Sequence, residues 1–195
     1  MIQFKLKLQS KLLLTNMAGI MEKFLSRLLD YKVKNVSTFV DEVERPSGAI
    51  TSRIVIDYPN AVAIIPFISP NKFILVKQYR YALQQVTLEF PAGKIDPGET
   101  SEQAVVRELI EETGYRPESI KKIYSYAPAM GYSKEIVHLY FASNLVKTDQ
   151  YPHPDEIQSL SIHTKDDLWE MIGNGKLLDP DIIIGLLYCE KLGLI

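Results

Sequence analysis

The sequence predicts an α/β domain built in layers, and three observations lead to this fold class. Short apolar runs of strand length recur through the middle of the chain, the segment 101–113 changes to helical periodicity, and two further helical segments close the sequence. Strands that alternate with helices in this way favour layers of sheet and helix over a helical bundle or a β-sandwich. No Gly-x-Gly-x-x-Gly or Walker-type loop opens the central helix, so the common nucleotide-binding folds are not supported.

The charges of the chain are nearly balanced, with 22 lysines and arginines against 24 aspartates and glutamates and a formal net charge of -2. No basic field therefore exists to hold a long nucleic acid, whereas a small phosphorylated ligand fits if a bound cation neutralises it locally. The single cysteine, Cys189, excludes an internal disulfide and a cysteine-based zinc cluster. This composition fits a reducing, cytoplasmic location best.

Three segments are expected along the chain. Residues 1–35 form an N-terminal extension, whose apolar run Leu12–Leu14 is far too short for a membrane span or a signal-peptide core. Residues 36–58 are predicted as a β-hairpin, because two β-rich runs flank the turn sequence Arg45-Pro46-Ser47-Gly48. Residues 59–195 form the main domain.

The main domain is expected to alternate strands with helices. Apolar runs predict strands at residues 61–67, 73–78, 87–90, 123–126 and 136–142. Two helices are expected to close the chain. The last is predicted to begin at Asp179-Pro180, a capping residue followed by proline at the first helical position, and to end at Gly193.

The central helix has well-defined ends and two different faces. Thr100 and Gln103 form a capping box at its start, and Gly114 is suited to the left-handed conformation that ends a helix. At about 100° per residue, one side of the helix is apolar, and it carries Ala104, Val105, Val106, Leu109 and Ile110. The opposite arc is charged, and it carries Arg107, Glu108, Glu111 and Glu112.

The carboxylates of this arc need positive charge nearby. Glu108 lies four residues before Glu112 and three before Glu111, and like charges at such spacings repel one another on a helix. Arg107 is placed to pair with Glu111 or with Glu99, but one guanidinium does not neutralise four carboxylates. Because Mg²⁺ takes oxygen ligands, usually one or two carboxylates plus waters and substrate phosphate, it suits this arc better than Zn²⁺ does. The pattern indicates a site where Mg²⁺, with Mn²⁺ as a substitute, activates a diphosphate for hydrolysis.

A charge run on a helix more often forms only a solvated face, and the wider spacing decides between the two interpretations. Residues 93–115 match the pattern Gly-x5-Glu-x7-Arg-Glu-apolar-x-Glu-Glu-x-Gly-apolar, with Tyr115 at the last place, where an aliphatic residue is more usual. This segment resembles a complete Nudix box. Its flanks resemble the ADP-ribose pyrophosphatase branch of that family, and they read Lys77-Gln78-Tyr79-Arg80, Leu88-Glu89-Phe90-Pro91-Ala92-Gly93-Lys94 and Gly131-Tyr132-Ser133-Lys134-Glu135.

The resemblance implies a fold and a set of metal ligands. The fold would be a Nudix-type α/β/α sandwich with a mixed sheet, joined to the N-terminal hairpin. Glu108 and Glu112 would be metal ligands together with the carbonyl oxygen of Ala92. Glu111 would bind a further cation, and both Glu111 and Arg107 are expected to be catalytic residues. Arg107, like Glu99, would orient the loop and the helix.

The resemblance also implies groups that bind the phosphates and move the proton. Arg53 and Arg80, on strands before the box, resemble arginines that hold substrate phosphates, because the planar guanidinium binds phosphate oxygens through two donors. Each also fits the simpler description of a surface arginine. Enzymes of this branch often take their general base from a mobile loop after the last core strands. Glu156 is the first candidate for that base and Glu135 the second.

The function implied is Mg²⁺-dependent hydrolysis of ADP-ribose to AMP and ribose 5-phosphate. Another nucleotide sugar or a dinucleoside polyphosphate is an alternative substrate. A non-catalytic sensor that binds ADP-ribose is an alternative of another class, although a sensor has no need of a complete acidic set. The expected partners are a small nucleoside diphosphate derivative and a second copy of the chain, whose N-terminal strands would help to complete the neighbour's site. Neither a nucleic acid nor a membrane is expected as a partner.

Overall fold

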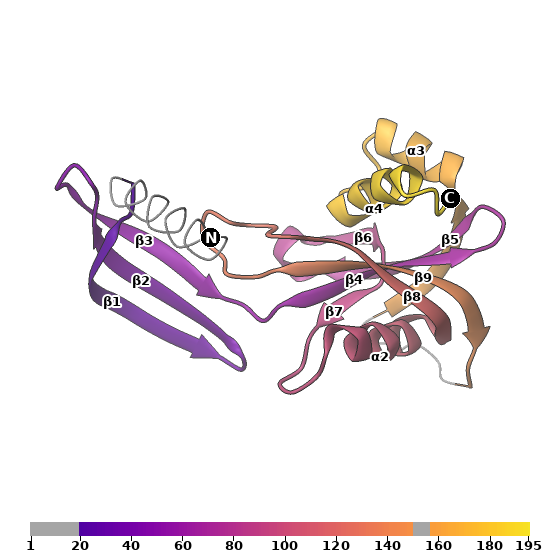
Figure 1. The fold of residues 1–195 in the computed structure, drawn as a ribbon, viewed down its shortest axis with the longest axis horizontal. Helices are drawn as coiled ribbons and strands as arrows, with labels where there is room; N and C mark the ends of the chain where they lie inside the picture. Colours follow the sequence, from indigo (N-terminus) through magenta and orange to yellow (C-terminus); the bar gives the residue numbers. More distant parts are fainter. Residues whose placement is uncertain (1–19, 150–156) are drawn as a thin grey trace, which may run out of the picture. The chain divides into compact units, whose positions relative to one another are not determined.

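The computed structural model describes residues 20–149 and 157–195, and they divide into two compact units. The first unit contains the described chain up to Tyr58 together with Ala129–Lys134, and the second contains Pro59–Pro128 and Glu135–Ile195. Figure 1 traces both along the chain. Among the described residues, no helix is long and apolar enough to cross a membrane.

The first unit is a three-stranded antiparallel sheet in the order β1-β2-β3, with β1 at Lys23–Val33, β2 at Val36–Glu44 and β3 at Ile50–Asp57. The predicted hairpin is confirmed as β2 and β3, joined by a turn in which Gly48 has a positive φ of 82°. Strand β1 differs from the sequence prediction, in which residues 1–35 form an extension without assigned strands. Its side chains are exposed along almost the whole strand, so it lacks the alternation that marks a half-buried strand.

The second unit contains a mixed sheet in the order β10-β5-β4-β9-β8, with β6 pairing with β5 and β7 pairing with β4. Strands β4 and β9 run parallel, and the other pairs are antiparallel. The elements are β4 (Ala61–Ile68), β5 (Lys72–Arg80), the 3-10 turn η1 (Tyr81–Leu83), β6 (Gln85–Glu89), β7 (Ala92–Lys94), α2 (Ser101–Thr113), β8 (Tyr115–Tyr126), β9 (Val137–Lys147), β10 (Ile157–Thr164), α3 (Lys165–Gly173) and α4 (Pro180–Lys191).

Two edge strands differ from the sequence prediction. Strand β8 is far longer than the predicted 123–126, and β10 was not predicted. Both strands lie at an end of the sheet order, where one side has no neighbouring strand. Each buries few side chains, so neither shows an apolar run.

The helices pack on both faces of this sheet, which confirms the α/β/α sandwich. Figure 1 shows α2 on one face and the pair α3 and α4 on the other. Strand β4 serves both layers, because Val62 and Ile64 join the core under α2 while Ala63 and Ile65 join the core under α3 and α4. All four side chains are fully buried. Alternation along one strand therefore builds two cores.

The last helix begins and ends close to its predicted limits. Asp179 is its N-cap, its side chain accepts a hydrogen bond from the amide of Asp181, and Pro180 is the first helical residue. The helix packs closely on β4, since a Cβ on Gly185 would lie only 2.8 Å from Cδ1 of Ile65. The start of α4 lies beside the segment that leads into the central helix, because the side chain of Asp179 accepts a hydrogen bond from the amide of Phe90.

Candidate active site

The central helix α2 has the ends that the sequence predicts. The Thr100 side chain accepts a hydrogen bond from the amide of Gln103, and the Gln103 side chain accepts one from the amide of Thr100. Gly114 adopts a φ of 74° at the other end, and its amide donates to the carbonyl oxygen of Ile110 at 2.8 Å. These caps fix which helical turns face the preceding loop.

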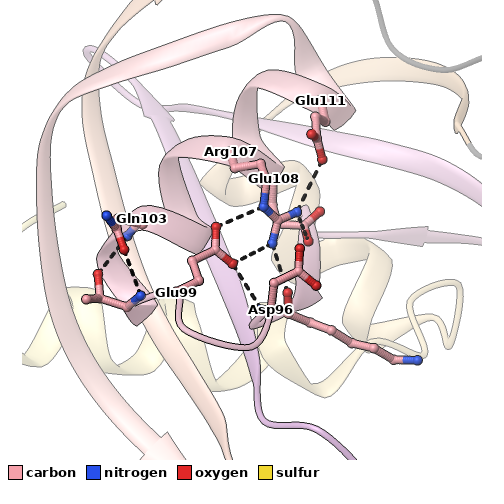
Figure 2. A network of polar contacts seen from close by, with 8 residues as sticks. Asp96, Glu99, Gln103, Arg107, Glu108 and Glu111 are labelled. Carbon is pink, nitrogen blue, oxygen red and sulfur yellow. Dashed lines mark hydrogen bonds and ion pairs between the residues drawn. The ribbon is translucent and has the colours of Figure 1, made fainter. Parts of the chain in front are cut away.

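Arg107 ties that loop to the helix, as Figure 2 shows. Its Nε and Nη2 donate to the two carboxylate oxygens of Glu99 at 2.9 and 2.8 Å, and Nη2 also donates to the carbonyl oxygen of Lys94 at 2.9 Å. Its Nη1 donates to Glu108 at 2.6 Å and to Glu111 at 3.2 Å. Arg107 therefore makes both of the predicted pairs, and these charge-assisted bonds hold the loop in one position.

Glu108 packs against the backbone of β7. If Gly93 carried a Cβ, that atom would lie 1.9 Å from Cδ and Oε1 of Glu108, so only glycine leaves room for the carboxylate. Burial raises the pKa of Glu108, the bond from Arg107 lowers it, and the charges of Glu111 and Glu99 raise it. The charged form of Glu108 is therefore poorly stabilised by water at this position, because the carboxylate is partly buried.

Glu112 is buried, although its place on the charged arc of the helix suggests exposure. Its side chain turns to β7, where Oε2 accepts a hydrogen bond from the amide of Ala92 at 3.0 Å. Burial raises its pKa to about 8, and the nearby charges of Glu108 and Glu89 add to this effect, while the Ala92 amide and Arg80 oppose it. Helical periodicity misses this because it cannot show that the backbone of β7 covers that part of the arc.

The remaining acidic residues of the helix face are more accessible. Glu111 is exposed, with a side-chain exposure of 54%, and in the described part of the chain its one ion pair is with Arg107. Within residues 20–149 and 157–195, no three histidine, cysteine, aspartate or glutamate side chains converge as they lie to hold a metal ion. The reason is local, since Glu108 turns to Arg107 and Glu112 turns to the Ala92 amide.

The chemistry of the donors nevertheless fits a hard divalent cation. The carboxylates of Glu99, Glu108 and Glu111 share one guanidinium, that of Arg107, and the carboxylate of Glu112 lies near those of Glu108 and Glu89 and the guanidinium of Arg80. Two of these carboxylates have pKa values raised by burial, so a cation beside them would relieve an unfavourable charge. All of the donors are oxygens, which Mg²⁺ prefers.

The two arginines expected at the substrate phosphates lie in different units. Arg80, at the end of β5, donates from Nε to Oε1 of Glu89 at 2.8 Å and from Nη2 to the second oxygen of that carboxylate. Arg53 lies in β3 of the first unit, where its Nε donates to Glu22 at 2.9 Å. Only Arg80 shares a unit with the acidic helix.

The structure describes one of the two expected general bases. Glu156 lies outside the described residues. Glu135 precedes β9 and is partly buried, and this burial raises its pKa, while Lys94 lowers it and Asp181 raises it. These electrostatic partners place Glu135 beside the segment before α2 and the start of α4.

A cavity of about 340 Å³ adjoins these residues in the second unit, and several of its lining residues are not predicted as site residues from the sequence. Its lining includes Arg80, Glu89, Ala92, Asp179 and Asp181. Asp179 accepts a hydrogen bond from the amide of Phe90 at 2.9 Å and so joins α4 to the strand before the box. The cap sequence predicts Asp179 as a helix start. No local pattern shows that Asp179 lies beside Phe90 in the fold, because the two residues are 89 positions apart in the sequence.

Comparisons with known proteins agree with this fold and site. The NUDIX domain family matches residues 57–182. The chain is 35% identical over 153 residues to the methanol dehydrogenase activator of Bacillus methanolicus, covering 77% of this chain and 83% of that protein. It is 30% identical over 176 residues to the ADP-ribose pyrophosphatase of Bacillus subtilis, covering 89% of this chain and 95% of that protein.

The crystal structure of an ADP compounds hydrolase has the same fold, with a TM-score of 0.76 at 18% identity over 88% of this chain and 93% of that one. The chain belongs to the Nudix family. More particularly, it is a Nudix hydrolase similar to ADP-ribose pyrophosphatases, as the sequence analysis expected.

Proposed function

We propose that the protein hydrolyses the diphosphate of ADP-ribose to AMP and ribose 5-phosphate, with Mg²⁺ or Mn²⁺ as its cation. The observation that carries this proposal is the presence of a buried carboxylate, Glu112, and a partly buried one, Glu108, on the helix that Arg107 ties to the preceding loop. Similarity to the Bacillus subtilis ADP-ribose pyrophosphatase over 89% of this chain supports the choice of substrate.

The proposed ligands are Glu108, Glu112 and the carbonyl oxygen of Ala92, with Glu111 available to a further cation. A bound divalent cation would withdraw charge from the phosphorus and lower the pKa of a coordinated water. Arg107 keeps the loop and the helix together, which holds the carboxylates in place. Arg80 would bind a substrate phosphate at the cavity.

Either Glu135 or Glu156 would accept the proton of the attacking water. Burial supports Glu135, because it raises the pKa of this carboxyl group, and a carboxylate with a raised pKa is a stronger base. The pH dependence of kcat/KM separates the two, since only loss of the true base removes the acidic limb of the profile. Glu135→Gln and Glu156→Gln are the variants to compare.

The decisive experiment measures AMP release from ADP-ribose with added Mg²⁺. The double variant Glu108→Gln, Glu112→Gln should lose turnover by at least about a thousandfold and stay folded, because it keeps the shape of both side chains and removes their charge. Glu118→Gln, on the exposed face of β8, is the matched control and should keep wild-type turnover. Full activity in the double variant would contradict the proposed site.

A panel of nucleotide sugars and dinucleoside polyphosphates tests the substrate itself. Faster turnover of another member than of ADP-ribose would keep the chemistry and change the substrate. Tight binding of ADP-ribose in the presence of Mg²⁺ without any AMP release would favour the sensor.

A second candidate function follows from the similarity to the Bacillus methanolicus protein, whose name describes activation of methanol dehydrogenase. The 35% identity to that activator is the reason to test whether this protein also activates methanol dehydrogenase. Methanol oxidation by the Bacillus methanolicus dehydrogenase would be measured with and without this chain. Activation by the wild type that disappears in the Glu108→Gln, Glu112→Gln variant would join both functions to the same site.

We further propose that the protein works as a homodimer through the sheet of the first unit. The row Leu29, Val40 and Ile54 runs across its three strands, and Tyr31 and Ile50 lie on the same face. All of these except Val40 are exposed by 48% or more. Exposed apolar side chains gathered on one face of a sheet are costly in water and are typical of an interface.

A cytoplasmic location is proposed on the composition. The only cysteine, Cys189, is buried and unpaired, which fits a reducing compartment.

A further inference from the structure

The Arg80 side chain is held along one edge by a carboxylate from the next strand. Arg80 ends β5 and Glu89 ends β6, and these two strands pair in antiparallel register. Nε donates to one oxygen of Glu89 at 2.8 Å and Nη2 donates to the other, so the two planar groups lie edge to edge. Such a pair fixes the plane of a guanidinium more strictly than a single hydrogen bond does.

Glu89 is itself held in position. Its side chain is only 12% exposed, whereas that of Arg80 is 43% exposed. The Thr87 hydroxyl, which is also buried, donates to Oε1 of Glu89 at 2.6 Å. Because Thr87 and Glu89 lie two residues apart in β6, they project on the same side of the strand. The more buried Glu89 carboxylate therefore fixes the position of the more exposed Arg80 guanidinium.

Among the residues that the structure describes, none binds the other edge of the Arg80 guanidinium. Nη1 makes no hydrogen bond or ion pair with any of the residues that the structure describes. Arg80 lines the 340 Å³ cavity, and its charge interacts with those of Glu112 and Asp179. The accessible donors therefore lie within electrostatic reach of the acidic helix.

Charge makes the position of Arg80 decisive. The described residues that line the cavity include three with carboxylates, Glu89, Asp179 and Asp181, and a single lysine or arginine, Arg80. An anion that entered the cavity would meet net negative charge unless the guanidinium faced it. An arginine that swung away on its flexible stem would lose this effect.

We propose that Glu89 is a positioning residue, anchored by Thr87, which orients Arg80 so that its remaining N–H donors bind a phosphate group of the substrate in the cavity. This inference takes its substrate from the proposed pyrophosphatase function. The roles of Glu89 and Thr87 go beyond that function. Glu89 does not touch the reacting atoms. It acts through the orientation of Arg80.

Steady-state kinetics on ADP-ribose and calorimetric binding of inorganic pyrophosphate, both with Mg²⁺, test the proposal together. Glu89→Gln keeps the size of the side chain but replaces one acceptor oxygen with an NH₂ group that faces the donors of Arg80. We expect KM and the pyrophosphate Kd each to rise about tenfold, with kcat changed much less, as for the loss of one charge-assisted contact. Arg80→Lys, which removes the fork but keeps the charge, should give a similar loss.

The double variant separates positioning from a structural effect. If Glu89 acts through the guanidinium, Glu89→Gln in the Arg80→Lys background should cause almost no further loss. Thr87→Val should raise KM about threefold in the wild type and leave it unchanged in the Glu89→Gln background, and it supplies the test should Glu89→Gln fold poorly. Glu190→Gln is the matched control, because it removes an exposed carboxylate on α4 that pairs with Lys165.

Three results would overturn the proposal. They are equal losses from Glu89→Gln with and without Arg80→Lys, tighter binding in Glu89→Gln, and no binding of pyrophosphate to the wild type. The first would make Glu89 a structural residue, and the second would make it a competitor of the phosphate. If the wild type bound pyrophosphate with the expected coupling but did not cleave ADP-ribose, the proposed function would fail while the role of Glu89 held.

Discussion

The carboxylate of Glu108 occupies the space that a side chain on Gly93 would need, since a Cβ there would lie 1.9 Å from its Cδ and Oε1. The first glycine of the box and its first glutamate after the arginine are therefore linked by contact, although fifteen positions separate them in the sequence. The glycine is required for space rather than for an unusual φ.

Gly93→Ala should consequently reduce turnover while the protein stays folded. The added methyl group displaces the Glu108 carboxylate, and a shift of about 1 Å in a catalytic group costs roughly a hundredfold in rate. Activity with ADP-ribose and Mg²⁺ is the measurement, with circular dichroism as the check on folding. Gly173→Ala is the control, because a Cβ at Gly173 would meet nothing within 4 Å. Wild-type activity in Gly93→Ala would show that Glu108 need not stay where it lies.

Arg107→Lys should loosen the loop before α2. Lysine retains the charge but cannot donate in parallel to the two oxygens of Glu99 and also to the Lys94 carbonyl and Glu108. We expect turnover to fall by at least about tenfold and the free energy of unfolding by about 2 kcal/mol, as for the loss of charge-assisted bonds. Hydrogen exchange of the amides of residues 95–100 checks the cause, because it should become faster in the variant. Unchanged exchange with reduced activity would point to a direct role of Arg107 in the chemistry.

Asp179 and Asp181 predict a dependence of stability on pH. Burial raises the pKa of both carboxyl groups, and the charge of Asp181 raises that of Asp179 further. Because the folded state binds these protons more tightly than the unfolded state, stability should fall as pH rises from about 4 toward neutrality. Asp181→Asn keeps an acceptor for the Tyr126 hydroxyl and removes one charge. It should raise the free energy of unfolding by about 1–2 kcal/mol at pH 8, and the gain should disappear at pH 4. Urea unfolding at both values is the measurement, and an equal gain at both would contradict the electrostatic explanation.

Ile54→Glu tests the proposed dimer. Ile54 is 58% exposed at the β3 end of the apolar row across the three-stranded sheet, so a charge there should cost little in a monomer and much in an interface. Light scattering after size-exclusion chromatography should show a dimer for the wild type and a monomer for the variant. Ile162→Glu is the control, because Ile162 is similarly exposed, at 54%, on the edge strand β10 of the other unit. A wild type that ran as a monomer would exclude the dimer.

The sequence predicts the central helix and its box well because their information is local. The capping box of Thr100 and Gln103, the stop at Gly114 and the pairing of Arg107 with Glu99 all depend on residues close together in the chain. The hairpin of the first unit and the start of α4 at Asp179 follow from turn and cap residues in the same way.

What the sequence does not predict depends on contacts across the fold. Glu112 is buried by the backbone of β7, and Glu89 gains its role from Arg80 on the neighbouring strand. Strand β8 lies at the edge of its sheet, where few side chains are buried and no apolar run marks it. Periodicity measures the faces of one element, so it cannot show which other element covers them.

Because β4 alternates between the two cores, with Ile64 under α2 and its neighbour Ile65 under α3 and α4, neither helical layer has a hydrophobic core independent of the other. Loss of the α3 and α4 layer would expose the strand on which the acidic helix α2 rests. The second unit should therefore melt in one cooperative transition, in which the C-terminal helices and the acidic helix are lost together.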